Sequence, residues 1–297
     1  MNILTDIFND FSTFSRYAPG VETNMDLNDL QSSGLTARKR IETAISPAVF
    51  LSIIAKEEEN SPLMEALRAA IANMTMGTQL IFDSINRRKN DVNVYKYELE
   101  AMRRSYMENY CNALDTIVEL LMEAEPHDGD NDSPAALWRK ARYFSIISDC
   151  EIKTMADFDM VYPIDGSYLF FFRTVPLQKE TLDELLSAYF CKLTEDNAQR
   201  VRPLLLLALA KKTIAKSLRR FDILEFPPTI RNLFEESHAS RSGKDEHDAA
   251  FSLADRLDRE AEDLLASADT LLTTESDADI CSNSAYNRLE DKIIMLP

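Results

Sequence analysis

The chain has 297 residues, of which 45% are hydrophobic and 28% charged; this balance is typical of a folded globular protein and excludes a chain that is disordered throughout. Its formal net charge of −17 disfavours binding of a nucleic-acid backbone over a broad face. Glycine occurs only six times, which leaves few of the left-handed positions that hairpin-rich folds need, so we expect helices to dominate.

The N-terminal segment, residues 1–17, spaces its apolar side chains by three and four residues, which predicts a short amphipathic helix. It lacks a basic region followed by a long apolar stretch, so we expect no secretory signal and synthesis in the cytoplasm. The longest purely apolar run, Leu204 to Ala210, is far shorter than the roughly 20 residues that cross a bilayer. We therefore expect no membrane span.

The first half of the chain predicts three helices after a surface loop at 18–35. The first helix covers about residues 36–56. The second begins at Ser61-Pro62, because serine is a good N-cap and proline suits the first helical position, and it runs to about residue 83. The third, about 96–124, has the strongest apolar stripe of this half. The stripe consists of Leu99, Met102, Tyr106, Tyr110, Ala113, Ile117 and Leu121.

Residues 125–134 form the clearest linker, because proline lies near both ends and acidic turn formers lie between. Beyond it, Asp165-Gly166 stands between runs of aromatic and β-branched side chains, which is a hairpin signal. We therefore expect a short extended or hairpin segment near 158–175. Further helices are expected at about 178–192, 196–220 and 246–273, the last two separated by the rigid Phe226-Pro227-Pro228 stretch.

Parts of the sequence recur. The same offset of 138 residues separates Leu67 from Leu205 and Thr75 from Thr213, within two similar apolar segments. We therefore predict a mainly α fold made of two tandem, internally duplicated helical units of about three helices each. The expected division is 1–125 for the first unit, 126–145 for an acidic linker and tryptophan-bearing connector, 146–274 for the second unit and 275–297 for a C-terminal tail.

One acidic stretch has the beginning of a calcium-binding loop. Asp128, Asp130 and Asp132 stand at its positions 1, 3 and 5. However, Ser133 replaces the required glycine and Arg139 replaces the bidentate glutamate. A solvated acidic linker is the better interpretation.

No other motif specifies chemistry. The sequence has no nucleophile elbow, zinc-protease helix, phosphate-binding glycine-lysine loop or dinucleotide fingerprint. Its three histidines lie in or beside polar connecting segments, without the spacing of a metal site. We therefore expect no catalytic residue, no cofactor and no metal. The histidines are His127, His238 and His247.

Two basic clusters, Arg87-Arg88-Lys89 and Arg219-Arg220, fall near the ends of corresponding helices in the two halves. Cations are favoured there by the backbone carbonyls that lack partners, and we prefer this structural interpretation to DNA contact. If the protein formed a ring around DNA, the same five side chains would face phosphates.

Several large apolar side chains are candidates for a protein interface. Trp138, Phe170 and Phe172 serve either the core or an interface between subunits. The apolar end of the tail, with Ile293, Ile294 and Leu296, docks either on a neighbouring subunit or on its own chain.

The layout resembles a family of structural proteins from phages and prophages of gut bacteria, of the head-tail connector or head-completion type. The resemblance covers most of the chain, and the segment from Phe226 to Asp245 departs from it by being longer and more charged. The shared features are Asp10-Phe11, an apolar helix at 63–82, the helix at 96–124, a tryptophan after the linker, Asp157-Phe158 with an aromatic segment, and helices at 200–220 and 249–273.

The resemblance implies a virion protein: a helical adaptor that forms a homo-oligomeric ring between the portal protein and the tail or neck proteins, without an active site. DNA contact is possible in such a ring but is not indicated by the sequence. Two alternatives stay open. One is a cytoplasmic helical adaptor that binds a partner protein through a groove, and the other is an all-helical enzyme that uses acidic side chains and histidine.

Overall fold

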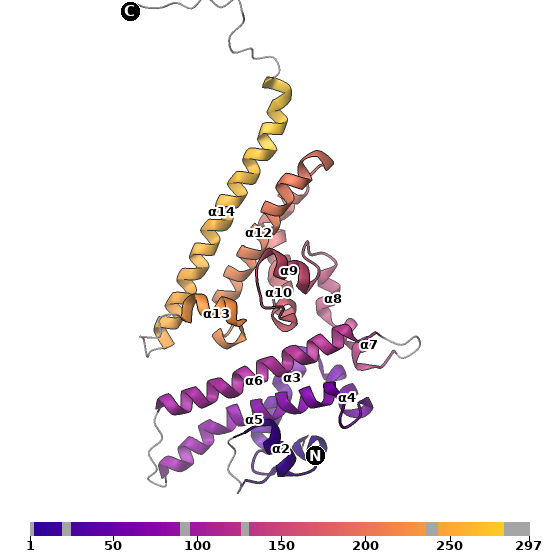
Figure 1. The fold of residues 1–297 in the computed structure, drawn as a ribbon, viewed down its shortest axis with the longest axis vertical. Helices are drawn as coiled ribbons and strands as arrows, with labels where there is room; N and C mark the ends of the chain where they lie inside the picture. Colours follow the sequence, from indigo (N-terminus) through magenta and orange to yellow (C-terminus); the bar gives the residue numbers. More distant parts are fainter. Residues whose placement is uncertain (1–2, 20–24, 90–95, 126–130, 236–242, 282–297) are drawn as a thin grey trace, which may run out of the picture.

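The computed structural model describes residues 3–19, 25–89, 96–125, 131–235 and 243–281. These residues form helices and no strand, which confirms the mainly α prediction (Figure 1). Within the same ranges, no helix is long and apolar enough to cross a membrane. The helices are α1 (Ile3–Ile7), α2 (Phe11–Tyr17), α3 (Gln31–Ile45), α4 (Pro47–Lys56), α5 (Pro62–Lys89), α6 (Lys96–Glu123), α7 (Pro134–Arg139), α8 (Arg142–Ile147), α9 (Met155–Val161), α10 (Tyr168–Thr181), the π-helical η1 (Leu182–Leu186), α11 (Ser187–Phe190), α12 (Glu195–Arg220), the 3-10 helix η2 (Ile223–Glu225), α13 (Pro228–Glu235) and α14 (Gly243–Cys281).

The first half is built around the antiparallel pair α5 and α6, with α1 to α4 packed against it (Figure 1). Two buried polar side chains of α5 fix the N-terminal segment. Arg68 donates to the carbonyl oxygens of Ile7 and Glu59 at 3.1 and 2.8 Å, and Asn73 donates to that of Tyr17 at 2.9 Å. These bonds satisfy carbonyls that no helix would otherwise pair, so the short α1 and α2 are held in place.

Two expected helices are each divided in the structure. The segment 1–17 splits because the Asp10 carboxylate accepts a hydrogen bond from the Thr13 amide at 2.6 Å and so begins α2. The expected helix 36–56 starts earlier, at Gln31, and splits into α3 and α4 at Ser46. The count of three helices per unit was therefore too low.

A serine before a proline begins three helices of this chain. The predicted start at Ser61-Pro62 is confirmed, because the Met64 amide donates to the Ser61 hydroxyl at 3.1 Å. The same arrangement begins α4 at Ser46 and α7 at Ser133. In each case the serine oxygen accepts from an amide of the first turn, and proline occupies a position whose N–H would have had no partner.

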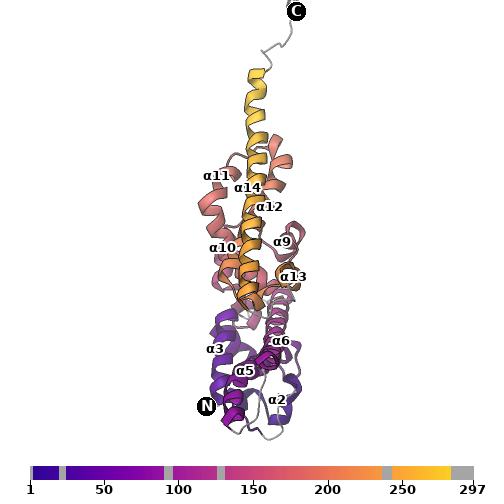
Figure 2. The ribbon, with the colours of Figure 1, turned by 90° about the vertical axis from the view of Figure 1, so that its left-hand side faces the viewer.

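The second half is built around another antiparallel pair, α12 and α14 (Figures 1 and 2). Its buried stripe on α14 follows spacings of three, four and seven residues, as in a coiled coil, and is rich in alanine. Small side chains let two helices approach closely. The stripe consists of Ala250, Ala254, Leu257, Ala261 and Ala268. The helix continues to Cys281, so the predicted start of the C-terminal tail at residue 275 is too early.

The predicted extended segment near 158–175 was wrong. Asp165 and Gly166 do form a turn, with positive φ angles of 57° and 65°. The aromatic run after them is helical, however, because the Ser167 hydroxyl accepts from the Phe170 amide at 3.2 Å and caps α10. From Tyr168 the chain stays helical through η1 to the end of α11, so the helix expected at 178–192 begins ten residues earlier.

Buried apolar residues of both halves belong to one continuous core. The expected connector 126–145 takes part in it, because α7 carries the fully buried Trp138. Each half contributes one long antiparallel pair, and these pairs contain the recurring sequence segments. They are joined differently, α12 to α14 through η2 and α13, and an internal duplication stays a prediction.

Candidate functional site

A cleft of about 930 Å³ opens between the two halves. Its walls come from the corner between α3 and α4, the middle of α6, the corner between α7 and α8, the first turns of α10, and the segment that follows α12. Clefts between packed units are common ligand sites, so the chemistry of its lining matters.

An ion pair lies on one wall of this cleft. The Arg173 guanidinium approaches the Glu225 carboxylate at 2.8 Å and lies 4.8 Å from the centre of the Phe221 ring. Burial raises the pKa of Glu225, and the charge of Arg173 opposes that shift. The exposed Arg40 also lines the cleft, and its charge likewise lowers the pKa of Glu225. Asp222 also lines the cleft and raises the pKa of Glu225, so two acidic and two basic side chains largely balance one another here.

Beside this ion pair, α6 contributes a thiol and a phenol to the lining. Burial raises the pKa of Cys111 to about 12 and also raises that of Tyr110. A thiol with so high a pKa stays protonated at neutral pH and is a poor nucleophile. This part of the lining offers an apolar surface with two weak hydrogen-bond donors. It is therefore better suited to binding a molecule than to covalent chemistry.

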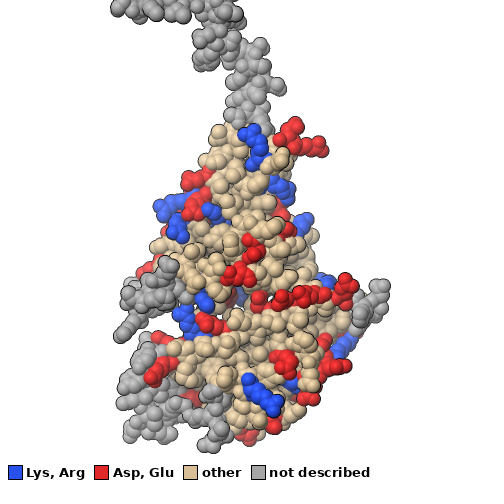
Figure 3. Space-filling model, viewed as in Figure 1, with Lys and Arg blue, Asp and Glu red and all other residues tan. Residues whose placement is uncertain are grey.

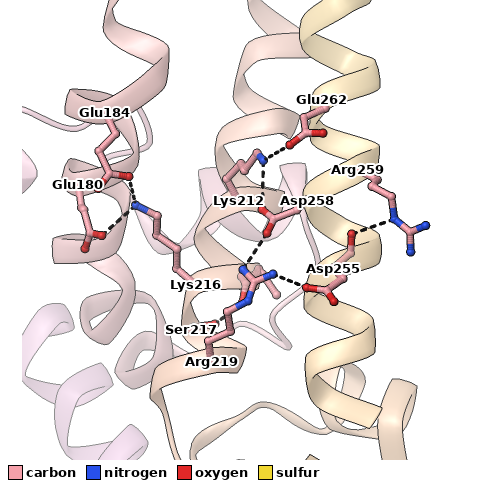
Figure 4. Close-up of polar contacts among 11 residues, drawn as sticks. Glu180, Glu184, Lys212, Lys216, Ser217, Arg219, Asp255, Asp258, Arg259 and Glu262 are labelled. Atoms are coloured by element: carbon pink, nitrogen blue, oxygen red, sulfur yellow. Dashed lines mark hydrogen bonds and ion pairs between the residues drawn. The ribbon is translucent and has the colours of Figure 1, made fainter. Parts of the chain in front are cut away.

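The predicted DNA-facing residues of α12 are engaged within the chain, as Figure 4 shows for Arg219. Arg219 pairs with Asp255 and Asp258 of α14, both at 2.7 Å. Arg220 binds both carboxylate oxygens of Glu180, at 2.6 and 2.7 Å. Their guanidinium groups are thus paired with acidic side chains of the neighbouring helices, while the Arg220 side chain stays 49% exposed.

The same pattern continues along α12. Lys212 lies between Asp258 and Glu262, at 3.2 and 3.1 Å, and Lys216 contacts Glu184 at 2.6 Å (Figure 4). On the face drawn in Figure 3, basic and acidic side chains of this upper part lie interspersed. Arg87, Arg88 and Lys89 lie in the last turn of α5, as expected from the helix-end interpretation, and the structure describes nothing of their side chains.

The aromatic interface candidates lie in the core. Trp138 is 1% exposed and its ring packs edge-on against Phe172, with centroids 5.3 Å apart. Phe170 is 2% exposed and contacts Phe226. These rings join the connector and α10 to the rest of the core, so the core alternative holds for all three. Ile293, Ile294 and Leu296 lie outside the described residues.

A small apolar patch lies at the outer end of α5 and α6. Ile81, Phe82 and Met102 are 45%, 49% and 42% exposed. Gly77 packs beside Tyr106, so one turn further along this antiparallel pair Ile81 lies opposite Met102. The sequence placed Met102 on the buried stripe of its helix. Met102 is 42% exposed although it lies along the partner helix, so this end of the stripe is only partly covered. We call these three residues the tip patch.

No metal site was found among the described residues, which hold no group of three or more metal-binding side chains. His127, His238, Asp128 and Asp130 lie outside them. His247 stacks on the ring of Phe251, with centroids 4.4 Å apart.

Comparison of the chain with protein-family models, with curated proteins and with solved structures gave no match. The resemblance to phage structural proteins therefore rests on the sequence layout alone.

Proposed function

We propose that the protein is a structural component of a phage virion, a helical connector in the neck between portal and tail. It works by packing against other protein subunits, including copies of itself in a ring. The observation that carries the proposal is the tip patch: Ile81, its sequence neighbour Phe82 and the opposite Met102 are each nearly half exposed, which is typical of a surface that a partner covers.

The position of the tip patch supports a protein partner. It lies towards the end of a long helical pair and outside the lining of the cleft between the halves, whereas small molecules bind in concave sites that enclose most of their surface. The pairing of α12 cations with acidic side chains fits the same function, because it leaves the strongest basic cluster of the second half neutralised. The proposal accordingly includes no contact with DNA through Arg219 or Arg220.

Binding to the neighbouring virion proteins tests this function. The full chain would be mixed with the portal protein, and separately with the tail or neck proteins, encoded in the same genome, and complexes would be measured by light scattering after size exclusion. We expect one of these proteins to bind. Replacing Phe82 and Met102 by serine should weaken that complex at least tenfold, because both are apolar contacts at its centre.

The control is Leu233→Ser, since Leu233 is 50% exposed on α13 in the other half of the molecule. It should leave the affinity unchanged. Absence of any complex with the virion proteins, or a complex that tolerates the double substitution, would contradict the proposal. A non-viral adaptor would use the same patch. Portal, capsid and terminase genes beside this gene would support the connector, and their absence would favour the adaptor.

A further inference from the structure

A second apolar surface lies far from the tip patch, between the end of α9 and the N-terminal half of α12. It is a groove of about 440 Å³, lined by Met160, Val161, Pro203, Leu206 and Leu207, among other residues. Met160 is 81% exposed, which is unusual for so large an apolar side chain. Methionine is flexible and adapts to irregular apolar partners, so this residue is suited to cover a bound segment.

The groove also offers a backbone acceptor. Pro203 lies inside α12 and has no N–H, so the helical hydrogen bond to the carbonyl of Gln199 is missing. Gln199 itself lines the groove. A segment that brings a backbone N–H to this point would supply the missing donor, which an apolar ligand without amides could not do.

The chain's own C-terminal segment starts close to this groove. α14 runs antiparallel to α12, as Lys211 pairs with Glu260 at 2.5 Å and the later Arg219 pairs with the earlier Asp255 at 2.7 Å. The end of α14 at Cys281 therefore lies beyond the start of α12 (Figures 1 and 2). Pro203 is eight residues into α12, about 12 Å along its axis.

The length of chain beyond α14 is sufficient. Eleven residues lie between Cys281 and Ile293, and an extended chain of that length spans up to about 40 Å. This distance allows the chain to turn back around α12, whose diameter with side chains is about 10 Å. Tethering at this distance gives an effective concentration on the order of millimolar, which favours docking on the same chain over docking on another copy.

The composition of the segment matches the groove. Ile293, Ile294, Met295 and Leu296 are four consecutive apolar residues. In the chain from 282 to 297, two basic residues are balanced by two acidic ones, so the segment is not repelled by a protein of net charge −17.

We propose that residues 293–296 pack into the groove between α9 and α12 of their own chain, with backbone amides near the Gln199 carbonyl. The inference is independent of the proposed connector function, because it concerns a different surface and an intramolecular contact.

The test uses the full chain with Ile293, Ile294 and Leu296 replaced by serine, which empties the groove without shortening the protein. A fluorescent peptide with the sequence of residues 286–297 is then titrated in, and its anisotropy is measured. We expect the peptide to bind this variant and to bind the unsubstituted chain at least tenfold more weakly, because the tethered segment competes for the groove.

Adding Met160→Glu and Leu207→Glu to the serine variant should abolish peptide binding. Adding Leu233→Glu instead, at a 50% exposed site elsewhere, should not. Failure of the peptide to bind the serine variant would overturn the proposal, as would binding that survives Met160→Glu and Leu207→Glu. Light scattering shows whether the segment binds its own chain or a second copy. If the molar mass in solution falls when the three serines are introduced, the segment binds another subunit and the proposal is overturned.

Discussion

Asp115 of α6 caps α10 across the boundary between the two halves. Its Oδ1 atom accepts hydrogen bonds from the Leu169 amide at 2.7 Å and from the Ser167 hydroxyl at 3.1 Å. Burial raises the pKa of Asp115, and these hydrogen bonds oppose the shift. One carboxylate thus satisfies an amide at the start of α10 and joins the first half to the second.

Replacing Asp115 by alanine should lower the free energy of unfolding by about 1–2 kcal/mol, because the Leu169 amide loses its acceptor in a partly buried place. Asp115→Asn keeps an oxygen at the same position and should cost less than half as much. Urea denaturation of both variants provides the measurement. Unchanged stability in Asp115→Ala would show that the cap does not hold the halves together.

The carboxylate of Glu180 should make stability depend on pH. Hydrogen bonds from Arg220 and Lys216 lower its pKa from 4.5 to about 2. The ionised form of this carboxylate is therefore more favoured in the folded state than in the unfolded chain. The resulting stabilisation is present above pH 4.5, the ordinary pKa, and is lost as the pH falls towards 2.

Glu180→Gln should accordingly lower the free energy of unfolding at pH 7 by about 1 kcal/mol, a value reduced for solvent screening. The difference from the unsubstituted protein should shrink as denaturation is repeated at pH values from 5 down to 2. Glu119, an exposed residue of α6, gives the control. Its glutamine variant should leave the free energy of unfolding at pH 7 within about 0.5 kcal/mol of that of the parent protein, and an offset for Glu180→Gln that stays constant from pH 5 to 2 would contradict the assigned pairing.

The continuous core predicts that both halves unfold together. Trp138 is fully buried and contacts Phe144 and Phe172 of two different helices. Trp138→Ala should cost about 3–5 kcal/mol and should keep a single transition in thermal unfolding followed by circular dichroism. Leu185→Ala, at a 46% exposed site, should cost much less. Two separate transitions in the unsubstituted protein would indicate independent units instead.

Much of the fold could be predicted from local sequence signals. The helices at 96–124 and 196–220 agree with α6 and α12 within a residue or two, because their apolar stripes are long and periodic. The run Phe170 to Phe172 could not be read in this way. All three rings are buried, and a short run of consecutive apolar residues fits a buried helix and a buried strand equally well.

The candidate sites were harder to predict, because they depend on which helices meet. Asp115 caps a helix that starts 53 residues later in the chain, and no local motif marks such a pair. Arg219 and Arg220 form a basic cluster in the sequence, but the acidic residues that pair with them come from α10 and α14. The start of α4 at Ser46-Pro47, in contrast, is marked by the same serine-proline pair as the start of α5 at Ser61-Pro62 and could have been predicted.

Ser46 provides the last prediction, because its backbone lies in a region that favours glycine. Its φ of 81° and ψ of 151° are strained for a residue with a Cβ atom, at a cost of about 1–3 kcal/mol. The residue lines the cleft between the halves. Its hydroxyl offers some compensation by accepting from the Val49 amide, but at 3.4 Å that hydrogen bond is long.

Ser46→Gly should therefore raise the free energy of unfolding, by about 1 kcal/mol, since relief of strain outweighs loss of a weak cap and glycine is itself an acceptable N-cap. Ser46→Ala removes the hydroxyl and keeps the strain, so it should destabilise the protein. Urea denaturation of the two variants beside the parent chain tests this opposition of signs. If the glycine and alanine variants are destabilised equally, the contribution of Ser46 to stability comes from its hydroxyl and not from its backbone angles.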